Sequence, residues 1–101
     1  MAVKVIIELT AKPGKRDELK RAIESIMAQF GPRLSAMGSL GSTLYEVLGD
    51  PDMLVEIADW ESAEARDAVM QDQEVAAALA PVMGLFGAPF KATVLKPQSA
   101  S

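Results

Sequence analysis

The chain has 101 residues, half of them hydrophobic, and its formal net charge is −4 at pH 7. This length suits a single domain, and the acidic balance argues against nucleic acid as a partner, because phosphate binding needs clustered Lys and Arg. The sequence has no histidine, cysteine or asparagine, which removes the usual zinc and haem ligands and the Ser-His and Cys-His nucleophile pairs, so we expect no zinc or haem site of the usual type.

The first half of the chain predicts a strand, a helix and a second strand. Apolar and polar residues alternate over 2–10, as in a half-buried strand. After a turn at Pro13-Gly14, apolar residues recur at helical spacing over 15–30. Gly31-Pro32 is expected to end this helix, and residues 33–37 are expected to add at most a short helical turn. Residues 42–48 have the composition of the second strand.

The second half predicts a hairpin, a divided helix and a last strand. Turn chemistry over 49–52 is followed by a third strand over 53–60. Ser62 is a candidate N-cap for the next helix. Its apolar stripe is interrupted by the polar residues 72–74, which predicts two helical pieces. A loop over 84–89 then leads to a fourth strand over 90–95.

This order, β-α-β-β-α-β, predicts an α+β, ferredoxin-like fold with a four-stranded antiparallel sheet. We expect one domain over 1–97 and a loose tail over 98–101. The longest uncharged stretch, 75–90, contains two prolines and two glycines and is not expected to span a membrane. Without cysteines or the pattern of a signal peptide, the expected location is cytoplasmic.

Both faces of the predicted sheet carry apolar residues. The third strand has Val55 and Ile57 on one face and Leu54, Ala58 and Trp60 on the other. Two helices cover only one face of such a sheet, and a large uncovered apolar face usually marks an interface. We therefore expect a homodimer packed through its sheet faces, which closes a dimeric α+β barrel.

Two segments resemble a known family. Residues 41–47 read Gly-Ser-Thr-Leu-Tyr-Glu-Val, and residues 60–65 read Trp-Glu-Ser-Ala-Glu-Ala. They are similar to the Gly-x-x-x-Tyr-Glu-aliphatic strand and the Trp-Glu-Ser-x-Glu-Ala helix start of the antibiotic biosynthesis monooxygenase (ABM) family, in the dimeric α+β barrel superfamily. Leu40 stands where a proline is common in that family, and Ala58 stands where a glutamate is frequent.

The resemblance implies an oxidoreductase that needs no cofactor. Members of the family oxidise aromatic polyketides or quinols without metal or flavin, because the deprotonated substrate itself passes an electron to O2. A related group degrades haem with an asparagine, a tryptophan and a histidine. Only Trp60 matches that set here, since the histidine position is Val69 and the chain has no asparagine. Haem degradation by that arrangement is not expected.

Glu56, Tyr45 and Trp60 are the candidate catalytic residues. Glu56 precedes Trp60 by four residues on the same strand face, so both are expected to point into one cavity, where burial makes a carboxylate a better base. Tyr45 offers a phenolic hydrogen bond to a developing oxyanion. Each has a structural alternative: a core or interface plug for Trp60, edge packing for Tyr45, and an ion pair or solvent for Glu56.

A flat, small aromatic ligand is expected to contact aromatic and methionine side chains, which suit such molecules. The candidates are Trp60, Tyr45, Phe30, Met27 and Met70. At helical spacing such residues also serve as ordinary core. Arg33 and Arg66 offer positive charge to an anionic substrate, but arginines on helix surfaces ordinarily have no chemical role.

Two functions remain open from the sequence. The first is a cofactor-independent monooxygenase acting on a small aromatic, polyketide or quinol-type substrate. The alternative is a non-catalytic, dimeric small-molecule-binding or stress-response module of the same superfamily, which the missing histidine and asparagine favour. A third class, an assembly protein, predicts no pocket at all.

Overall fold

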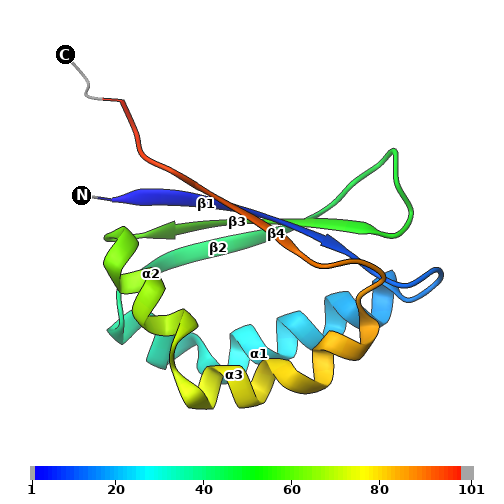
Figure 1. Cartoon of the computed structure of the whole chain (residues 1–101), viewed down its shortest axis with the longest axis horizontal. Coiled ribbons are helices and arrows are strands. Elements are labelled where there is room, and N and C mark those ends of the chain that lie inside the picture. The colour runs from blue at the N-terminus through cyan, green and yellow to red at the C-terminus, as the bar shows by residue number, and fades with distance from the viewer. Residues whose placement is uncertain (1, 99–101) are drawn as a thin grey trace.

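A computed structural model describes residues 2–98 and shows a four-stranded antiparallel sheet with its helices on one face (Figure 1). The order of strands across the sheet is β2-β3-β1-β4, which confirms the predicted ferredoxin-like α+β fold. The strands are β1 (Val3–Thr10), β2 (Ser39–Glu46), β3 (Met53–Trp60) and β4 (Lys91–Leu95). The helices are α1 (Arg16–Ala36), α2 (Ala63–Met70), α3 (Gln73–Leu79) and the 3-10 helix η1 (Ala80–Leu85).

Three predictions about the ends of elements can be compared with these bounds. The predicted loop over 84–89 begins inside η1, and the predicted tail over 98–101 lies outside the described residues except for position 98. The third strand has the bounds that the sequence predicts. Within residues 2–98, no helix combines the length and the apolar character needed to cross a bilayer.

The register of β3 decides which side chains face the helices. β3 pairs with β1 on one side and with β2 on the other, and Val5 lies opposite Ala58 while Leu9 lies opposite Leu54. Side chains alternate across a strand, so the residues on the parity of Leu54 point toward the helices. Ile57, on the other parity, points to the open face of the sheet.

The core between sheet and helices forms two clusters rather than one. Val82 and Leu19 close the cluster near the Leu9–Leu54 pair, and Val69 and Val75 close the cluster near the Val5–Ala58 pair. The first cluster consists of Leu9, Ala11, Leu19, Leu54 and Val82, and the second of Val3, Val5, Ala58, Trp60, Val69 and Val75. The division leaves the middle of the covered face without fully buried residues.

Helix α1 continues through Pro32 to Ala36, so the predicted end at Gly31-Pro32 is wrong. Proline removes one helical N–H and crowds the preceding turn, which ordinarily ends a helix. Here Leu34 and Met37, beyond the proline, pack against the cluster that contains Trp60. This tertiary packing outweighs the local preference of the sequence.

Strand β2 begins at Ser39 and ends at Glu46, earlier than the predicted 42–48. Its pairing with β3 is irregular between Ser39 and Gly41, where Gly41 has a φ of 115°. The preceding Gly38 also has a positive φ, and a Cβ at this position would lie 2.8 Å from the Cβ of Ala65. Glycine therefore lets the α1–β2 turn lie directly against the start of α2.

Ser62 caps α2 as the sequence predicts, and α3 has an N-cap of its own. The Ser62 hydroxyl accepts a hydrogen bond from the Ala65 N–H at 3.0 Å and starts α2. A carboxylate oxygen of Asp72 accepts from the N–H groups of Glu74 and Val75 at 2.9 and 3.1 Å, and this cap starts α3. The break predicted at residues 72–74 is confirmed, because α2 ends at Met70 and Asp72 caps the start of α3.

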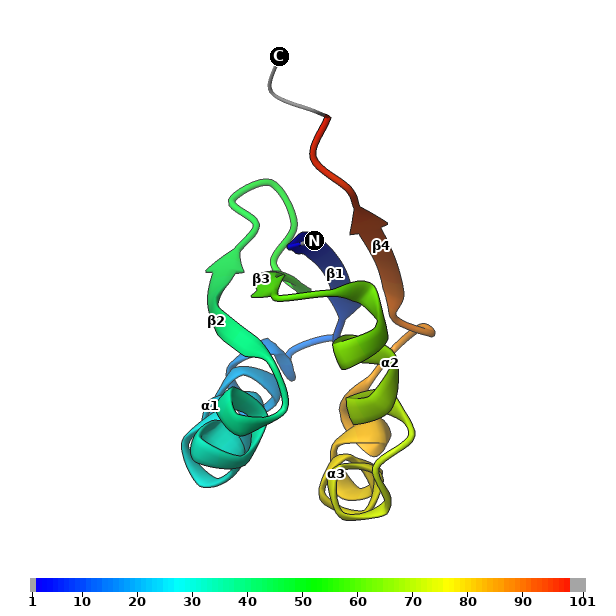
Figure 2. The same cartoon turned by 90° about the vertical axis from the view of Figure 1, so that its left-hand side faces the viewer.

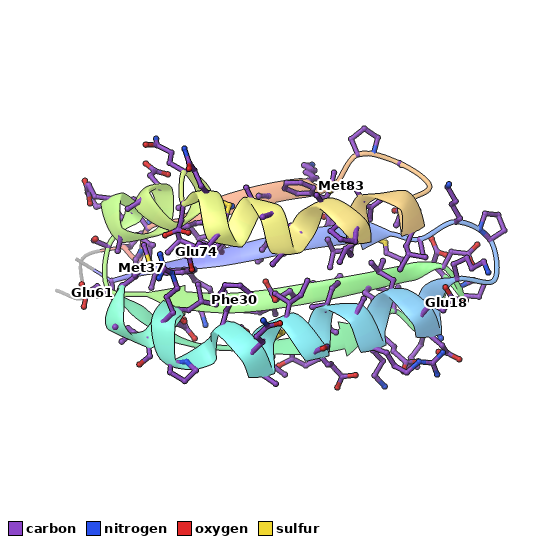
Figure 3. The ribbon with its side chains drawn as sticks, turned by 90° about the horizontal axis from the view of Figure 1, so that it is seen from below. Glu18, Phe30, Met37, Glu61, Glu74 and Met83 are labelled. Atoms are coloured by element: carbon purple, nitrogen blue, oxygen red, sulfur yellow. The ribbon has the colours of Figure 1, made fainter. Side chains whose placement is uncertain are left out.

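The helices form one layer under the sheet, in which α1 runs along one side and α2 and α3 run along the other (Figures 2 and 3). An ion pair joins them at one end, where the Arg33 Nη2 lies 2.7 Å from an Asp72 oxygen and the Arg33 Nη1 lies 3.5 Å from Glu74. The hydrogen bond from Arg33 lowers the pKa of Asp72.

Replacing Pro32 by Ala should stabilise the protein, because it restores a backbone donor inside α1 and relieves the crowding of the preceding turn. We expect the free energy of unfolding in urea to rise by about 1 to 3 kcal/mol. Pro51→Ala in the β2–β3 turn is the matched control. It raises the conformational entropy of the unfolded chain without restoring a helical hydrogen bond, so it should not increase the free energy of unfolding. A loss of stability in Pro32→Ala would show that the helix requires the proline geometry.

Candidate functional site

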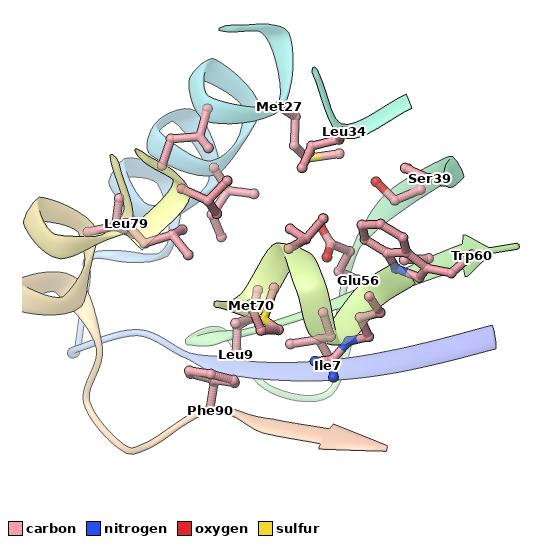
Figure 4. Close-up of a pocket in the computed structure, with 18 of the residues that line it drawn as sticks. Ile7, Leu9, Met27, Leu34, Ser39, Glu56, Trp60, Met70, Leu79 and Phe90 are labelled. Carbon is pink, nitrogen blue, oxygen red and sulfur yellow. The ribbon is translucent and has the colours of Figure 1, made fainter. Parts of the chain in front are cut away.

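A cavity lies in the middle of the covered sheet face, in the gap between the two core clusters. Its floor includes Ile7 and Glu56, which are opposite each other in the β1–β3 register, between the Val5–Ala58 and Leu9–Leu54 pairs. Both floor residues are only partly buried. The cavity has a volume of about 180 Å³, and Figure 4 shows how its side chains surround it.

The walls of the cavity are apolar except at four positions. The apolar residues come from the sheet, α1, α2, α3, η1 and the segment before β4: Ile7, Leu9, Ile23, Ile26, Met27, Leu34, Ala58, Trp60, Val69, Met70, Val75, Leu79, Val82, Met83, Phe86 and Phe90. The polar residues are Ser39, Ser42, Glu56 and Arg66. Such a surface fits an apolar ring and supplies few, well-separated polar contacts.

Glu56 is the acidic group of this cavity. Burial raises the pKa of Glu56 above its ordinary value of 4.5, and the positive charge of Arg66 opposes part of that rise. Within residues 2–98 its carboxylate has no hydrogen-bond donor, yet no polar side-chain atom is sealed from solvent without a partner. The Glu56 oxygens are therefore accessible from the cavity, and a bound molecule can reach them.

Trp60 is both a core residue and a wall of the cavity. It is 7% exposed, belongs to the cluster with Val5 and Ala58, and also lines the cavity beside Glu56 (Figure 4). The two residues share a strand face because Ala58 lies between them on the same parity. Trp60 can thus pack in the core and contact a ligand in the cavity at the same time.

Tyr45 lies on the opposite face of the sheet from the cavity. It is paired with Val55, on the parity that faces away from the helices, and its side chain is 49% exposed. The expectation that Tyr45 and Trp60 hold the same ring is therefore corrected for the cavity of this chain. The alternation of side chains along β2 separates them.

Of the other residues predicted to contact a ligand, two line the cavity and one does not. Met27 from α1 and Met70 from α2 line the cavity, and their role as substrate contacts stays a prediction. Phe30 does not line it and instead packs against the core cluster around Trp60, so this placement is also corrected. One helical turn separates Phe30 from Leu34, and it is Leu34 that reaches the cavity.

Arg66 is a candidate site residue to which its place on a helix surface assigns no chemical role in the sequence. It lines the cavity and is partly buried, whereas Arg33 is engaged by Asp72. The sequence spacing does indicate that Arg66 points inward. It precedes Val69 and Met70 by three and four residues and therefore shares their face of the helix.

A second, shallower groove adjoins the cavity between α1 and β2. It has a volume of about 540 Å³ and shares Met27, Leu34, Ser39 and Ser42 with the cavity. Its further lining consists mainly of small residues around Gly31 and Gly41. A ligand longer than one ring can therefore extend from the cavity into this groove.

The raised pKa of Glu56 predicts a pH-dependent stability. The folded protein holds this proton more tightly than the unfolded chain, so the stabilisation is complete below about 4.5 and is lost as pH rises through the folded-state pKa. The Glu56→Gln variant should not lose stability from this group as the pH rises, because glutamine does not titrate. Its unfolding free energy relative to wild type should grow with pH across this window, whereas exposed Glu24→Gln should show no such trend. A constant difference from pH 4 to 8 would contradict the assignment.

Comparison with known proteins places this geometry in a family. A family model for antibiotic biosynthesis monooxygenase matches residues 2–81. The structure of Rv0793 from Mycobacterium tuberculosis is similar over 100% of both chains, with 25% identity and a TM-score of 0.78. No curated protein matches the sequence.

Two further solved structures share the fold. A variant of SnoaB, a cofactor-independent oxygenase from Streptomyces nogalater, matches with 16% identity and a TM-score of 0.79, over 98% of this chain and 95% of its own. A conserved protein from Methanosarcina mazei matches with 15% identity and a TM-score of 0.81, over 97% and 94%. With the family model covering most of its length, the chain belongs to the antibiotic biosynthesis monooxygenase family.

Proposed function

We propose that the protein is a cofactor-independent monooxygenase acting on a small aromatic, quinol-type substrate. The observation that carries the proposal is an accessible carboxylate, Glu56, in an otherwise apolar cavity beside Trp60. Membership of the family supports the reaction class, and SnoaB, described as a cofactor-independent oxygenase, is a structural neighbour.

The size of the cavity favours one aromatic ring at the reacting position. An engineered apolar cavity of about 150 Å³ is known to hold benzene, and the cavity here measures about 180 Å³. A fused polyketide would need the adjoining groove between α1 and β2 for its remaining rings. We therefore favour a substituted quinol over a three-ring substrate.

In the proposed mechanism, Glu56 removes the proton of a substrate hydroxyl. The resulting anion transfers one electron to O2, and the two radicals combine to form a carbon–oxygen bond. Glu56 then returns its proton to the peroxide. The O–O bond breaks, the second oxygen atom leaves as water together with the hydrogen of the attacked carbon, and a carbonyl remains at that carbon. Apolar walls favour these steps, because they exclude water from the charged intermediates, and the Trp60 face packs against the ring.

Replacing Glu56 by Gln tests the mechanism. Loss of a general base should lower the rate of O2 uptake with a panel of substituted hydroquinones by about 10²- to 10⁴-fold. Glu24→Gln should retain the wild-type rate, and Tyr45→Phe should do so as well, because Tyr45 lies outside the cavity.

Unchanged turnover in Glu56→Gln would contradict the role of this residue as the base. Wild-type protein that quenches Trp60 fluorescence on binding these ligands but consumes no O2 would instead favour the alternative, a non-catalytic small-molecule-binding module.

We further propose that a second copy of the chain covers the open sheet face. Ile6 and Ile57 lie opposite each other at its centre and are flanked by Thr43 and Thr93 from the neighbouring strands. Figure 1 shows that helices cover only the other face. Burial of about 800 Å² per subunit is typical of a specific dimer.

Ile57→Glu should break this dimer, because it places a charge at the centre of the contact. We expect wild-type protein to have twice the 10.7 kDa chain mass in light scattering, and Ile57→Glu to have the chain mass itself. Ala28→Glu on the exposed side of α1 is the control and should stay dimeric. A wild-type monomer, or a dimeric Ile57→Glu variant with native circular dichroism, would contradict the proposed interface.

A further inference from the structure

Arg66 and Glu56 are the charged side chains that line the cavity, among the residues that the structure describes. The surrounding elements present Ile7 and Leu9 from β1, serines from β2, and apolar side chains from α1, α3 and η1. Glu56 comes from β3 and Arg66 from α2, so the two charges enter the cavity from different layers of the fold. Any charge on a bound molecule must be balanced by these two groups.

The two charged groups are near each other without forming an ion pair. The positive charge of Arg66 acts on Glu56, but within residues 2–98 the pair does not come within the 4.0 Å of a salt bridge, and Arg66 has no other carboxylate partner. Elsewhere in the same range, Arg16 and Arg33 each contact an acidic side chain at 2.7 to 2.9 Å. A partly buried guanidinium without an acidic partner is available to bind an anion that enters the cavity.

We propose that Arg66 is the counter-ion of the bound substrate, and that the cavity selects an acidic phenol or enol that binds as a monoanion after giving its proton to Glu56. The proposal rests on the proposed function for the role of Glu56 and deepens it by naming the substrate class. In the transfer, the substrate O–H bond breaks and a Glu56 O–H bond forms, with no change in oxidation state.

The net charge of the cavity and its ligand explains why a monoanion formed by proton transfer is preferred. Before the transfer, Glu56 carries −1, Arg66 carries +1 and the substrate is neutral. After it, Glu56 is neutral and the substrate oxygen carries the charge that Arg66 balances. The cavity therefore stays neutral throughout, which a low-dielectric site strongly favours. A ring that also bears a carboxylate brings a second negative charge that no lining residue balances, so such molecules should bind poorly.

Para-nitrophenol tests the proposal, because its anion is yellow and its neutral form is colourless. Wild-type protein should bind the anion and lower the apparent pKa of the bound probe relative to the free one. Arg66→Gln should bind the anion roughly 10-fold more weakly or worse, since a charge-assisted hydrogen bond is lost. Arg66→Lys should recover part of the affinity, and exposed Arg21→Gln should match wild type.

Glu56→Gln separates this proposal from the proposed function. This variant should lose turnover yet bind the anion at least as tightly as wild type, because the competing negative charge is gone. Binding of the anion to wild type should also take up a proton from solution, and binding to Glu56→Gln should not. These readouts need no O2 chemistry, so a protein without oxygenase activity can still satisfy them.

Two results would overturn the role of Arg66. The first is an Arg66→Gln variant with native circular dichroism that binds the anion as tightly as wild type. The second is a Glu56→Gln variant that binds the anion more weakly than wild type. Equal affinity for para-nitrophenol and for 4-hydroxy-3-nitrobenzoate, which bears both an acidic phenol and a carboxylate, would overturn the selectivity for a single negative charge.

Discussion

The antiparallel pairing of β1 with β3 is the constraint on which both faces of this molecule depend. Because side chains alternate with a period of two, a slip by one residue would exchange the faces. It would place Ile57 among the helices and turn Glu56 outward. Pairing of β3 with β2 on its other edge holds the same register. One set of hydrogen bonds thus fixes both the cavity and the open face that carries Ile6 and Ile57.

The cavity has an energetic consequence for the core. Where Ile7 faces Glu56, a fully packed domain would place a second aliphatic residue and join the two clusters. A partly buried carboxylate without a hydrogen-bond donor opposes folding, and the empty volume forgoes packing contacts. The tightly buried residues on either side, such as Leu54 and Val5, offset that cost. Departures of this kind from good packing are typical of sites that bind ligands.

Hydrophobic periodicity predicts much of this structure, including the order of the elements, the break at Asp72 and the shared face of Glu56 and Trp60. It fails where tertiary contacts decide. Packing of Leu34 and Met37 carries α1 past Pro32. The orientation of Tyr45 depends on the β2–β3 register, and residues 42–48 alternate too weakly to define it. The sequence does not predict that Arg66 rather than Arg33 lines the cavity, because a charged helix residue is ordinarily solvated.

The charged groups and the indole of the site lie close together in the chain. Glu56, Trp60 and Arg66 belong to one strand–turn–helix unit, residues 56–66, which Ser62 caps at its bend. The walls that shape the cavity come from segments distant in sequence, chiefly α1 and the stretch from α3 to Phe90. The charged and aromatic residues of the candidate site and the residues that shape the ligand space therefore lie in separate parts of the sequence. Under the proposed function, a change of ligand size requires substitutions only in the walls, and residues 56–66 can stay as they are.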